Sequence, residues 1–283
     1  MRTSVPLPHI VIVMPAYNEA EGITGFIDEI RLSLTPLAHK LSFVIADDRS
    51  TDTTATLFTT TPDVAVHTQT RNRGHGPTAL AAYREGLALD PTVLVHVDGD
   101  GQFLGADIAD AVRALVSTGA DVVHGVRRGR TDPWYRKALT AAVRLLVAAA
   151  IGRGVPDVNT PLRVYQPAIA QALVDAVGPD ALVPHIHFSL AEVRSNAVVR
   201  YVKVRSIPRR GSSTSGTMWG SGVRIALPPA RLREFTRNAL REVWQQSLRA
   251  GAPLRSIRLP VGAGAGASGA GASGGGDGGA SRP

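Results

Sequence analysis

The sequence predicts an α/β protein built on a single, mostly parallel, Rossmann-like sheet with flanking helices. Three observations lead to this class. Short apolar runs of four to six residues alternate with segments of helical spacing along the first two-thirds of the chain. Polar or glycine-rich residues follow directly after each of these runs. The chain has 283 residues, of which 44% are hydrophobic, and this is enough to bury such a sheet.

Five strands are expected in the first half of the chain, at residues 9–14, 41–46, 64–67, 93–97 and 121–126. Helices are expected between them, at about 23–34, 52–60, 77–89 and 107–118. Asn18 is a candidate N-cap for the first helix, with Glu21 as its capping-box partner. Pro77 suits the first turn of the third helix, where its missing N–H costs nothing.

The rest of the chain is expected to be more varied. A long apolar helix is predicted at 134–152, a strand at 198–204 and an amphipathic helix at 229–250. The last helix combines an apolar stripe with many arginines, so both packing on the domain and lying in a membrane interface remain open. From about residue 260 a Gly/Ala/Ser tail has nothing to bury and is expected to be disordered. Neither a transmembrane helix nor a signal peptide is predicted.

Charge is unevenly distributed. The formal net charge is +8, and residues 194–258 alone hold 14 Lys and Arg against 2 Asp and Glu. Such a basic part indicates an anionic partner, either a phosphate-rich substrate, a membrane surface or nucleic acid, or else a solvated basic face. Nucleic acid is disfavoured because the segment lacks an RNA-binding motif and interleaved aromatic residues. The absence of cysteine excludes disulfides and thiolate metal sites and is compatible with a reducing cytoplasm.

Polar segments follow directly after the five predicted strands. They read PAYNE, DDRSTDTT, RNRGHG, DGDGQ and RRGR, at residues 15–19, 47–54, 71–76, 98–102 and 127–130. Ligands of open parallel sheets bind beyond the carboxyl ends of the strands. A purely structural sheet has no need of this many aspartates and arginines along one edge. The sequence therefore predicts a ligand site there.

Asp98 and Asp100 are spaced to share one hard cation. Residues i and i+2 of an extended segment point the same way, and Gln102 continues this period. Oxygen ligands of this kind suit Mg²⁺ or Mn²⁺, and Mg²⁺ is usually held by one or two carboxylates together with substrate phosphates. A lone D-x-D is a weak motif, since Asp-Gly is common in turns. His185 and His187 have no third zinc ligand nearby, so a lining role is favoured over metal binding.

Four segments carry a resemblance to a known family. VIVMPAYNEAEGI, VIADDRSTDTT, RNRGHGPTALAAYREGL and HVDGDGQF occur in this order and, over about residues 10–216, resemble the family 2 glycosyltransferases, which have the GT-A fold. GVRRGRTDPWYRKALTAAVRLLV and VPDVNTPLRVYQ look most like the polyprenyl-phosphate sugar transferases, such as the dolichyl-phosphate mannosyltransferases. One departure is RRGSSTSGTMWG, which keeps Arg209, Arg210 and Gly211 but lacks the lysine that follows in many members.

The resemblance implies a nucleotide-sugar site at the ends of the first four strands. Its residues would be Pro15, Tyr17, Glu19, Asp47 or Asp48, Arg71, Asn72, Gly74, Gly76 and Asp98. The glycines would let the backbone approach the ligand closely. Asp98, Asp100 and Gln102 would hold Mg²⁺ or Mn²⁺ on the sugar-nucleotide diphosphate, where the cation stabilises the leaving group.

The resemblance also implies an acceptor side. Arg127 and Arg136 would bind the acceptor phosphate or the departing diphosphate. The other acceptor-side residues would be Asp157, Asn159, Arg163 and Arg209. Asp100, Arg127 and Asp157 would carry the catalysis. An ionised phosphate acceptor needs no strong base, whereas a hydroxyl acceptor would need Asp157 to take its proton.

The resulting prediction is a metal-dependent glycosyltransferase that inverts the anomeric centre and moves a sugar from a UDP- or GDP-sugar to a polyprenyl phosphate. Alternatives are the same donor chemistry on a soluble hydroxyl acceptor and a non-catalytic sugar-nucleotide-binding protein. The catalytic domain is expected at 1–216, with a nucleotide half to about 127 and an acceptor half from 128. A basic extension would occupy 217–259 and the tail 260–283. The expected location is the cytoplasm, with peripheral contact at the inner face of the membrane as one variant and no nucleic-acid partner.

Overall fold

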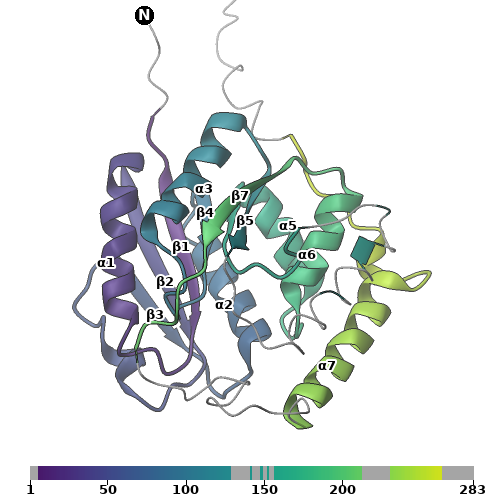
Figure 1. Cartoon of the computed structure of the whole chain (residues 1–283), viewed down its shortest axis with the longest axis horizontal. Coiled ribbons are helices and arrows are strands. Elements are labelled where there is room, and N and C mark those ends of the chain that lie inside the picture. Colours follow the sequence, from purple (N-terminus) through teal and green to yellow (C-terminus); the bar gives the residue numbers. More distant parts are fainter. Residues whose placement is uncertain are drawn as a thin grey trace, which may run out of the picture.

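The computed structural model describes residues 6–128, 141, 147–148, 152, 156–211 and 230–262. Within these residues seven strands form one sheet in the order β3-β2-β1-β4-β6-β5-β7 (Figure 1). Neighbouring strands run parallel except at β6, which is antiparallel to both β4 and β5. The strands are β1 His9–Ala16, β2 Lys40–Asp47, β3 Val64–Thr68, β4 Val93–His96, β5 Val122–Arg128, β6 Arg163–Tyr165 and β7 Val199–Arg205.

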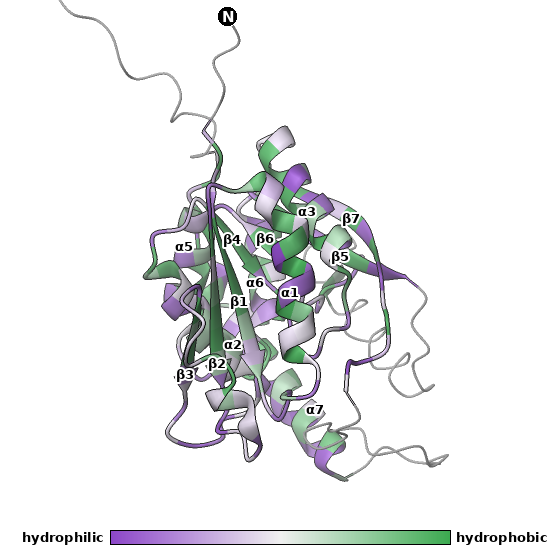
Figure 2. Ribbon diagram, turned by 90° about the vertical axis from the view of Figure 1, so that its left-hand side faces the viewer, coloured by the Kyte–Doolittle hydropathy of each residue, from purple (hydrophilic) through white to green (hydrophobic). Residues whose placement is uncertain are grey.

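Helices cover both faces of the sheet. They are α1 Ile23–Leu34, α2 His75–Leu87, α3 Gly105–Thr118, α5 Pro167–Val177, α6 Pro184–Arg194 and α7 Ala230–Val243. Short helical turns occur at η1 Thr35–Leu37, η2 Thr53–Thr56, η3 Trp244–Leu248 and η4 Pro253–Arg255. Figure 2 shows the strongly apolar central strands between the two helical layers.

Alternating side chains of β1 pack into the two layers of the core, one on each face of the sheet. Ile10, Ile12 and Met14 pack against α1 and α3, whereas Val11 and Val13 pack against α2 and α5. This alternation is the two-residue period of a strand that is buried on both sides. The mostly parallel α/β sheet predicted from the sequence is therefore confirmed, and the expected strands lie within about two residues of the observed ones.

The predicted capping box at the start of α1 is wrong. The helix begins at Ile23 with Gly22 as its N-cap, and no side chain caps it. Asn18 instead has a φ of 55°, and its Oδ1 accepts hydrogen bonds from the N–H groups of Thr51 and Asp52. A Cβ at Gly22 would lie 2.7 Å from Arg210, so the glycine at this position allows close packing of a segment distant in sequence.

Three elements of the second half were not predicted, namely β6, α5 and α6. Strand β6 has only three residues, too few to show a period. Nearly every residue of α6 is buried, including two histidines, so its sequence shows no polar face. In contrast, α5 has Pro167 at its start, Gly178 after its end and a regular apolar stripe, so its signal was present in the sequence.

The amphipathic helix predicted at 229–250 is α7, continued by the π-helical turn η3. Its apolar stripe packs on the domain, where Leu232, Ala239 and Val243 join a cluster that includes Ile186 and Leu190 of α6. The carboxylate of Glu242 accepts from the N–H groups of Leu182 and Val183 at the start of α6. Packing is thus observed for the inner face of this helix.

Several predictions fall outside the described residues. They concern most of the helix at 134–152, the boundary between 216 and 217, and the tail from 263 onward. No helix within the described ranges is both long enough and apolar enough to cross a membrane.

Candidate functional site

The carboxyl ends of β1, β2 and β4 meet at one edge of the sheet. Backbone hydrogen bonds hold their continuations together: Asp48 N donates to the carbonyl of Ala16 (2.9 Å), and Gly99 N donates to the carbonyl of Pro15 (3.1 Å). Parallel strands end at the same edge, so the polar segments that follow them become neighbours.

Three carboxylates gather at this edge, and we call Glu19, Asp98 and Asp100 the carboxylate rim. Burial, and then the charge of Asp98, raises the pKa of Asp100 to about 6. Burial also raises the pKa of Glu19 to about 7; the ion pair with Arg209 opposes this rise, and the charges of Asp100 and Asp98 add to it. The rim is therefore electrostatically costly when all three groups are ionised without a counter-charge.

The rim fits a divalent cation that is shared with a ligand. Asp98 Oδ1 is buried and has no hydrogen-bond partner within the described residues. Asp100 Oδ1 accepts from Gln102 N at 3.1 Å, which curls the motif, and the Gln102 side chain is partly exposed. No three His, Asp or Glu side chains of the described residues form a complete metal site. The oxygen donors of Asp98, Asp100 and Gln102 are of the kind that Mg²⁺ or Mn²⁺ would accept, with the remaining ligands drawn from substrate phosphates and water.

One residue at the rim was missed by the sequence analysis. His75, the first residue of α2, is exposed, and its Nε2 lies 3.6 Å from Asp98 Oδ1. The signal available was its place in RNRGHG after the third strand, where four neighbouring residues were predicted to line the nucleotide site and His75 was not.

A strap made by residues 206–211 lies beside the metal motif. Ile207 N donates to the carbonyl of Gln102 (3.2 Å) and Arg210 N to that of Asp100 (3.0 Å). The Arg210 guanidinium binds Glu29 of α1 and lies 5.2 Å from the ring centre of Phe26. The strap thus ties the end of β7 to α1 and to the D-x-D loop.

Arg209, predicted on the acceptor side, lies at the carboxylate rim instead. Its guanidinium pairs with Glu19 at 2.7 Å and donates to the carbonyl of Asn18. Both side chains of the pair are largely buried. The register of the strap places this arginine, because the next residue, Arg210, is committed to the D-x-D backbone.

Neither Asp47 nor Asp48 projects into open space. Both are buried. Asp47 accepts from Ser50 N, whereas Asp48 accepts from the N–H groups of Arg73 (2.7 Å) and Gly74 (2.9 Å). These carboxylates shape the loops behind the edge. The expectation that one of them contacts the nucleotide therefore has no support in this arrangement.

The other predicted nucleotide-side residues differ in exposure. Tyr17 is partly exposed, Arg71 and Asn72 are exposed, and Pro15 is buried at the end of β1. Asn72 Nδ2 donates to the carbonyl of Asp48 at 3.1 Å. These side chains line the edge next to the start of α2.

The two glycines predicted to admit the ligand have different roles. Gly74 has a φ of 85°, and a Cβ there would meet no atom of the described residues within 4 Å. A Cβ at Gly76 would lie 2.3 Å from the carbonyl oxygen of Ala181. Gly76 therefore permits close packing of α2 against the chain before α6, and its role toward the ligand stays a prediction.

A second group of side chains lies at the end of β5. Arg127 binds Asp157 through Nε (3.0 Å) and Nη2 (3.3 Å), and Nη2 also donates to the carbonyl of Asn159 (3.4 Å). The side chains of the ion pair are largely buried, whereas Asn159 is exposed. The structure thus brings together three of the residues predicted for the acceptor side. Arg136 lies outside the described residues.

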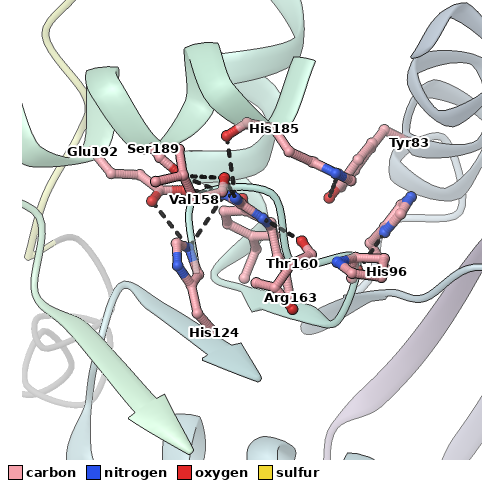
Figure 3. A network of polar contacts seen from close by, with 11 residues as sticks. Tyr83, His96, His124, Val158, Thr160, Arg163, His185, Ser189 and Glu192 are labelled. Carbon is pink, nitrogen blue, oxygen red and sulfur yellow. Dashed lines mark hydrogen bonds and ion pairs between the residues drawn. The ribbon is translucent and has the colours of Figure 1, made fainter. Parts of the chain in front are cut away.

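Arg163 does not belong to an exposed acceptor surface. It is the first residue of β6 and is completely buried, with its guanidinium bound to protein groups (Figure 3). Its partners are the carbonyl groups of Val158, Thr160 and His185, the side chains of Tyr165, Ser189 and Glu192, and His124 Nε2. The prediction of direct acceptor binding by Arg163 is therefore contradicted.

The two histidines of VPHIHF do not form a metal pair. His185 Nε2 lies 3.2 Å from the hydroxyl of Tyr83, and burial lowers the pKa of His185 well below its ordinary value. His187 contacts Ser247 Oγ through Nδ1 and Glu242 through Nε2. Residues two apart on a helix face different directions. Here His185 contacts α2, whereas His187 contacts α7 and η3.

Fold and site together define a class: a GT-A type α/β protein with carboxylates at the strand ends. The chain belongs to glycosyl transferase family 2, whose model matches residues 11–170. It is 24% identical over 184 residues to the undecaprenyl-phosphate 4-deoxy-4-formamido-L-arabinose transferase of Serratia proteamaculans (strain 568). This alignment covers 63% of this chain and 55% of that relative. The protein of the same name from Yersinia pestis (strain Pestoides F) is 25% identical over 207 residues, which are 72% of this chain and 62% of that protein. The chain thus spans less than two-thirds of these relatives.

Solved structures agree on the fold. Glucosyl-3-phosphoglycerate synthase from Mycobacterium tuberculosis, in complex with Mn²⁺, UDP and glucosyl-3-phosphoglycerate, matches with a TM-score of 0.56 and 18% identity, covering 84% of this chain and 79% of that one. Mannosyl-3-phosphoglycerate synthase from Rubrobacter xylanophilus matches with a TM-score of 0.55 and 16% identity, covering 86% and 78%. At this level of identity the likeness establishes the GT-A fold alone.

Proposed function

We propose that this protein is a metal-dependent glycosyltransferase that moves a sugar from a UDP-sugar to a polyprenyl phosphate with inversion. One observation carries the proposal. His96 of β4 and His124 of β5 both pair with Arg163 of β6. The carboxylate rim after β4 and the Arg127–Asp157 pair after β5 therefore lie at the same edge, two strand spacings or about 10 Å apart. That separation suits a donor diphosphate and an acceptor on either side of one sugar.

The donor side would work through charge. Asp98, Asp100 and Gln102 would hold Mg²⁺ or Mn²⁺, which supplies electrostatic stabilisation of the departing diphosphate. Tyr17, Arg71 and Asn72 stand where the nucleotide would lie. We propose UDP rather than GDP as the donor nucleotide because the structurally similar glucosyl-3-phosphoglycerate synthase was solved with UDP. The acceptor oxygen would attack the anomeric carbon as the bond to the β-phosphate oxygen breaks, and the electron pair would leave with the nucleoside diphosphate.

The acceptor side favours a phosphate over a hydroxyl. Arg127, one of two arginines at the end of β5, would bind an acceptor phosphate. Asp157 lies in a two-point ion pair that engages both of its carboxylate oxygens with Arg127. A phosphate acceptor arrives ionised and needs no base. The named activities of the relatives, on undecaprenyl phosphate, agree with this choice.

The outer face of α7 supports contact with a membrane that contains the lipid acceptor. Leu240 and Trp244 are 42% and 58% exposed. They lie at helical spacing with the exposed Arg233, Arg237 and Arg241. A basic face with apolar and aromatic residues is the pattern of interfacial helices. The proposal therefore places the protein at the inner face of an anionic membrane.

The first test combines donor binding with transfer. UDP, GDP and UDP-sugars would be titrated calorimetrically with Mn²⁺ or with EDTA, and radiolabelled UDP-sugars would be offered to undecaprenyl phosphate in detergent. We expect Mn²⁺-dependent UDP binding and a labelled lipid product. The Asp100→Asn variant should lose both, whereas Asp110→Asn, an exposed aspartate on α3, should retain them.

Other results would redirect or end the proposal. Transfer to 3-phosphoglycerate but not to the lipid would replace the lipid acceptor with a soluble one. Binding of the donor without any transfer would leave a non-catalytic sugar-nucleotide-binding protein. No binding of any nucleotide in the presence of Mn²⁺ would exclude the glycosyltransferase assignment for this chain.

Membrane contact is tested separately by sedimentation with vesicles. Each basic residue near an anionic surface contributes about 1 kcal/mol, so Arg237→Gln should weaken binding to phosphatidylglycerol vesicles about fivefold. Trp244→Ala should weaken it on zwitterionic vesicles as well. Arg113→Gln on α3 is the control. Equal binding by all variants would contradict a membrane role for α7.

A further inference from the structure

The loop at residues 157–161 contains two of the candidate acceptor residues, Asp157 and Asn159, yet it has no regular secondary structure. A loop without ladder hydrogen bonds must satisfy its buried carbonyl groups in other ways. Here side chains from distant parts of the chain do so. The carbonyl of Val158 accepts from Ser189 Oγ (3.1 Å), and that of Pro161 lies 2.6 Å from His96 Nδ1.

Arg163 provides two further contacts to this loop. Its Nη2 donates to the carbonyl of Val158 (2.8 Å), and its Nε donates to that of Thr160 (3.1 Å). Nη2 also donates to the carbonyl of His185 in α6 (3.1 Å). The planar guanidinium thus joins the loop to the first turn of a helix, in a geometry that no single ammonium group reproduces.

Buried charges hold the guanidinium in place. Arg163 Nη1 lies 3.3 Å from Glu192 Oε1, and Glu192 Oε2 lies 3.0 Å from His124 Nε2 (Figure 3). The hydroxyl of Tyr165 donates to Glu192 Oε1 at 2.9 Å. Burial raises the pKa of Glu192, but His124 and Arg163 outweigh it, so the pKa lies below its ordinary value and the carboxylate is ionised.

Such a pair is a poor way to gain stability, because an apolar substitute of equal volume is often as stable. Its geometric effect is specific, however. The same loop whose carbonyl groups Arg163 binds places Asp157 and the carbonyl of Asn159 on Arg127. We propose that Arg163, oriented by Glu192, is a positioning residue that sets the 157–161 loop against Arg127 for binding of the acceptor phosphate. This inference rests on the proposed function.

The test compares two variants of the same buried cluster. Arg163→Lys keeps the charge next to Glu192 but loses the fork that reaches the two loop carbonyls. Tyr165→Phe removes a hydroxyl that contacts both Glu192 and Arg163 Nη1, but it leaves the contacts of Arg163 with the loop in place, and it is the matched control. We expect Arg163→Lys to raise the KM for the lipid acceptor about 10- to 100-fold, as displaced binding groups do, with the KM for the UDP-sugar unchanged. Tyr165→Phe should leave both constants within about twofold of wild type.

A purely structural role would give a different result. If Arg163→Lys lowers the melting temperature and changes donor and acceptor constants alike, or changes neither constant, the positioning role is wrong. Should Arg163→Lys fail to fold, Ser189→Ala removes one contact to the Val158 carbonyl. It should then raise the acceptor KM without affecting the donor KM, and an unchanged acceptor KM would overturn the proposal.

Amide hydrogen exchange separates this inference from the proposed function. Exchange in residues 157–162 should rise in Arg163→Lys and remain at the wild-type level in Tyr165→Phe, whatever the enzyme does. Unchanged exchange in Arg163→Lys would show that Arg163 does not hold the 157–161 loop in place. If exchange rises but wild type transfers no sugar to any phosphate acceptor, the proposed function fails and the acceptor-positioning role fails with it.

Discussion

The carboxylate rim and the 157–161 loop both place polar side chains at the same edge of the sheet, but they do so by different means. At the rim, the D-x-D motif begins two residues after β4 ends, and a local hydrogen bond from Gln102 N to Asp100 Oδ1 curls it. In the loop, the backbone is held by side chains up to 65 residues distant in sequence, such as His96 on Pro161. Local geometry is visible in a sequence, whereas long-range support is visible only in the fold.

The largest expected effect concerns the long-range support. Glu192→Ala leaves the guanidinium of Arg163 buried without its ion-pair partner, and breaking a buried pair in this way costs about 3–5 kcal/mol. We expect the free energy of unfolding, measured in urea, to fall by that amount. Arg113→Ala, which removes an exposed pair with Asp110, should cost about 0.5 kcal/mol or less. Equal losses in the two variants would mean that the buried cluster contributes no more than a surface pair.

A crossed pair of variants tests whether the two regions act on different substrates. Asp98→Asn removes a candidate metal ligand and should weaken Mn²⁺-dependent UDP binding by about 100-fold or more, since even outer contacts to a metal contribute 10- to 100-fold. Asp157→Asn removes the partner of Arg127 and should leave UDP binding unchanged while raising the acceptor KM. Calorimetry and steady-state kinetics would measure both. If each variant impairs both substrates equally, the division between donor and acceptor sides is wrong.

The D-x-D loop also lies close to a segment distant in sequence at Gly101. Its φ is 68°, and a Cβ there would lie 2.6 Å from the Arg210 side chain. Gly119 has a similar φ of 62°, with nothing within 4 Å of a Cβ, and is the matched control. Gly119→Ala should lower the free energy of unfolding, measured in urea, by about 1–2 kcal/mol because of its left-handed backbone alone. Gly101→Ala should lower it by about 1 kcal/mol more, because the added Cβ displaces the strap, as overpacking does. Equal losses would show that Arg210 moves aside freely.

The smallest expected effect is a pH dependence at the start of α6. Burial raises the pKa of Glu242, but the hydrogen bonds from His187, Leu182 and Val183 outweigh it and hold the pKa below its ordinary value of 4.5. A lowered pKa in the folded state stabilises the protein above about pH 4.5, and this stability is lost as the pH falls through the folded value. Glu242→Gln should therefore destabilise the protein near neutral pH, with the difference from wild type shrinking in acid.

Urea unfolding at several pH values would measure this trend. Glu234→Gln, at an exposed position of the same helix, is the control and should show little difference from wild type at any pH. A Glu242→Gln difference that grows as the pH falls would contradict the assigned sign.

Much of the first half of the fold could be predicted from the sequence. The apolar runs at 9–14, 41–46 and 93–97 correspond to β1, β2 and β4, and the helices α1 and α3 follow from apolar spacing. The helix expected at 52–60 is instead the short 3-10 turn η2 at Thr53–Thr56. The exceptions are informative. Asn18 has the sequence of an N-cap but binds the loop after β2, because contacts between neighbouring loops outweighed a local preference worth about 1 kcal/mol.

Individual roles were harder to predict than the location of the site. Asp98 and Asp100 lie just after β4 and Arg127 lies at the end of β5, and their roles toward a ligand stay predictions. Arg163 and Arg209 do not have the surroundings that were expected, although both are arginines in basic or polar segments. Residue type alone does not distinguish a guanidinium that faces a ligand from one whose hydrogen bonds all go to buried carbonyl groups and side chains of the protein.

The sequence by itself determined the alternating strands and helices, the edge at which polar residues collect, and the likeness to family 2, because each depends on residues close together in the chain. Only the tertiary structure decided that Arg209 joins the carboxylate rim, that Gly76 serves packing, and that Arg163 supports the 157–161 loop from within. Those outcomes depend on which distant segments become neighbours, and a buried charge takes its role from the groups that surround it rather than from its own identity.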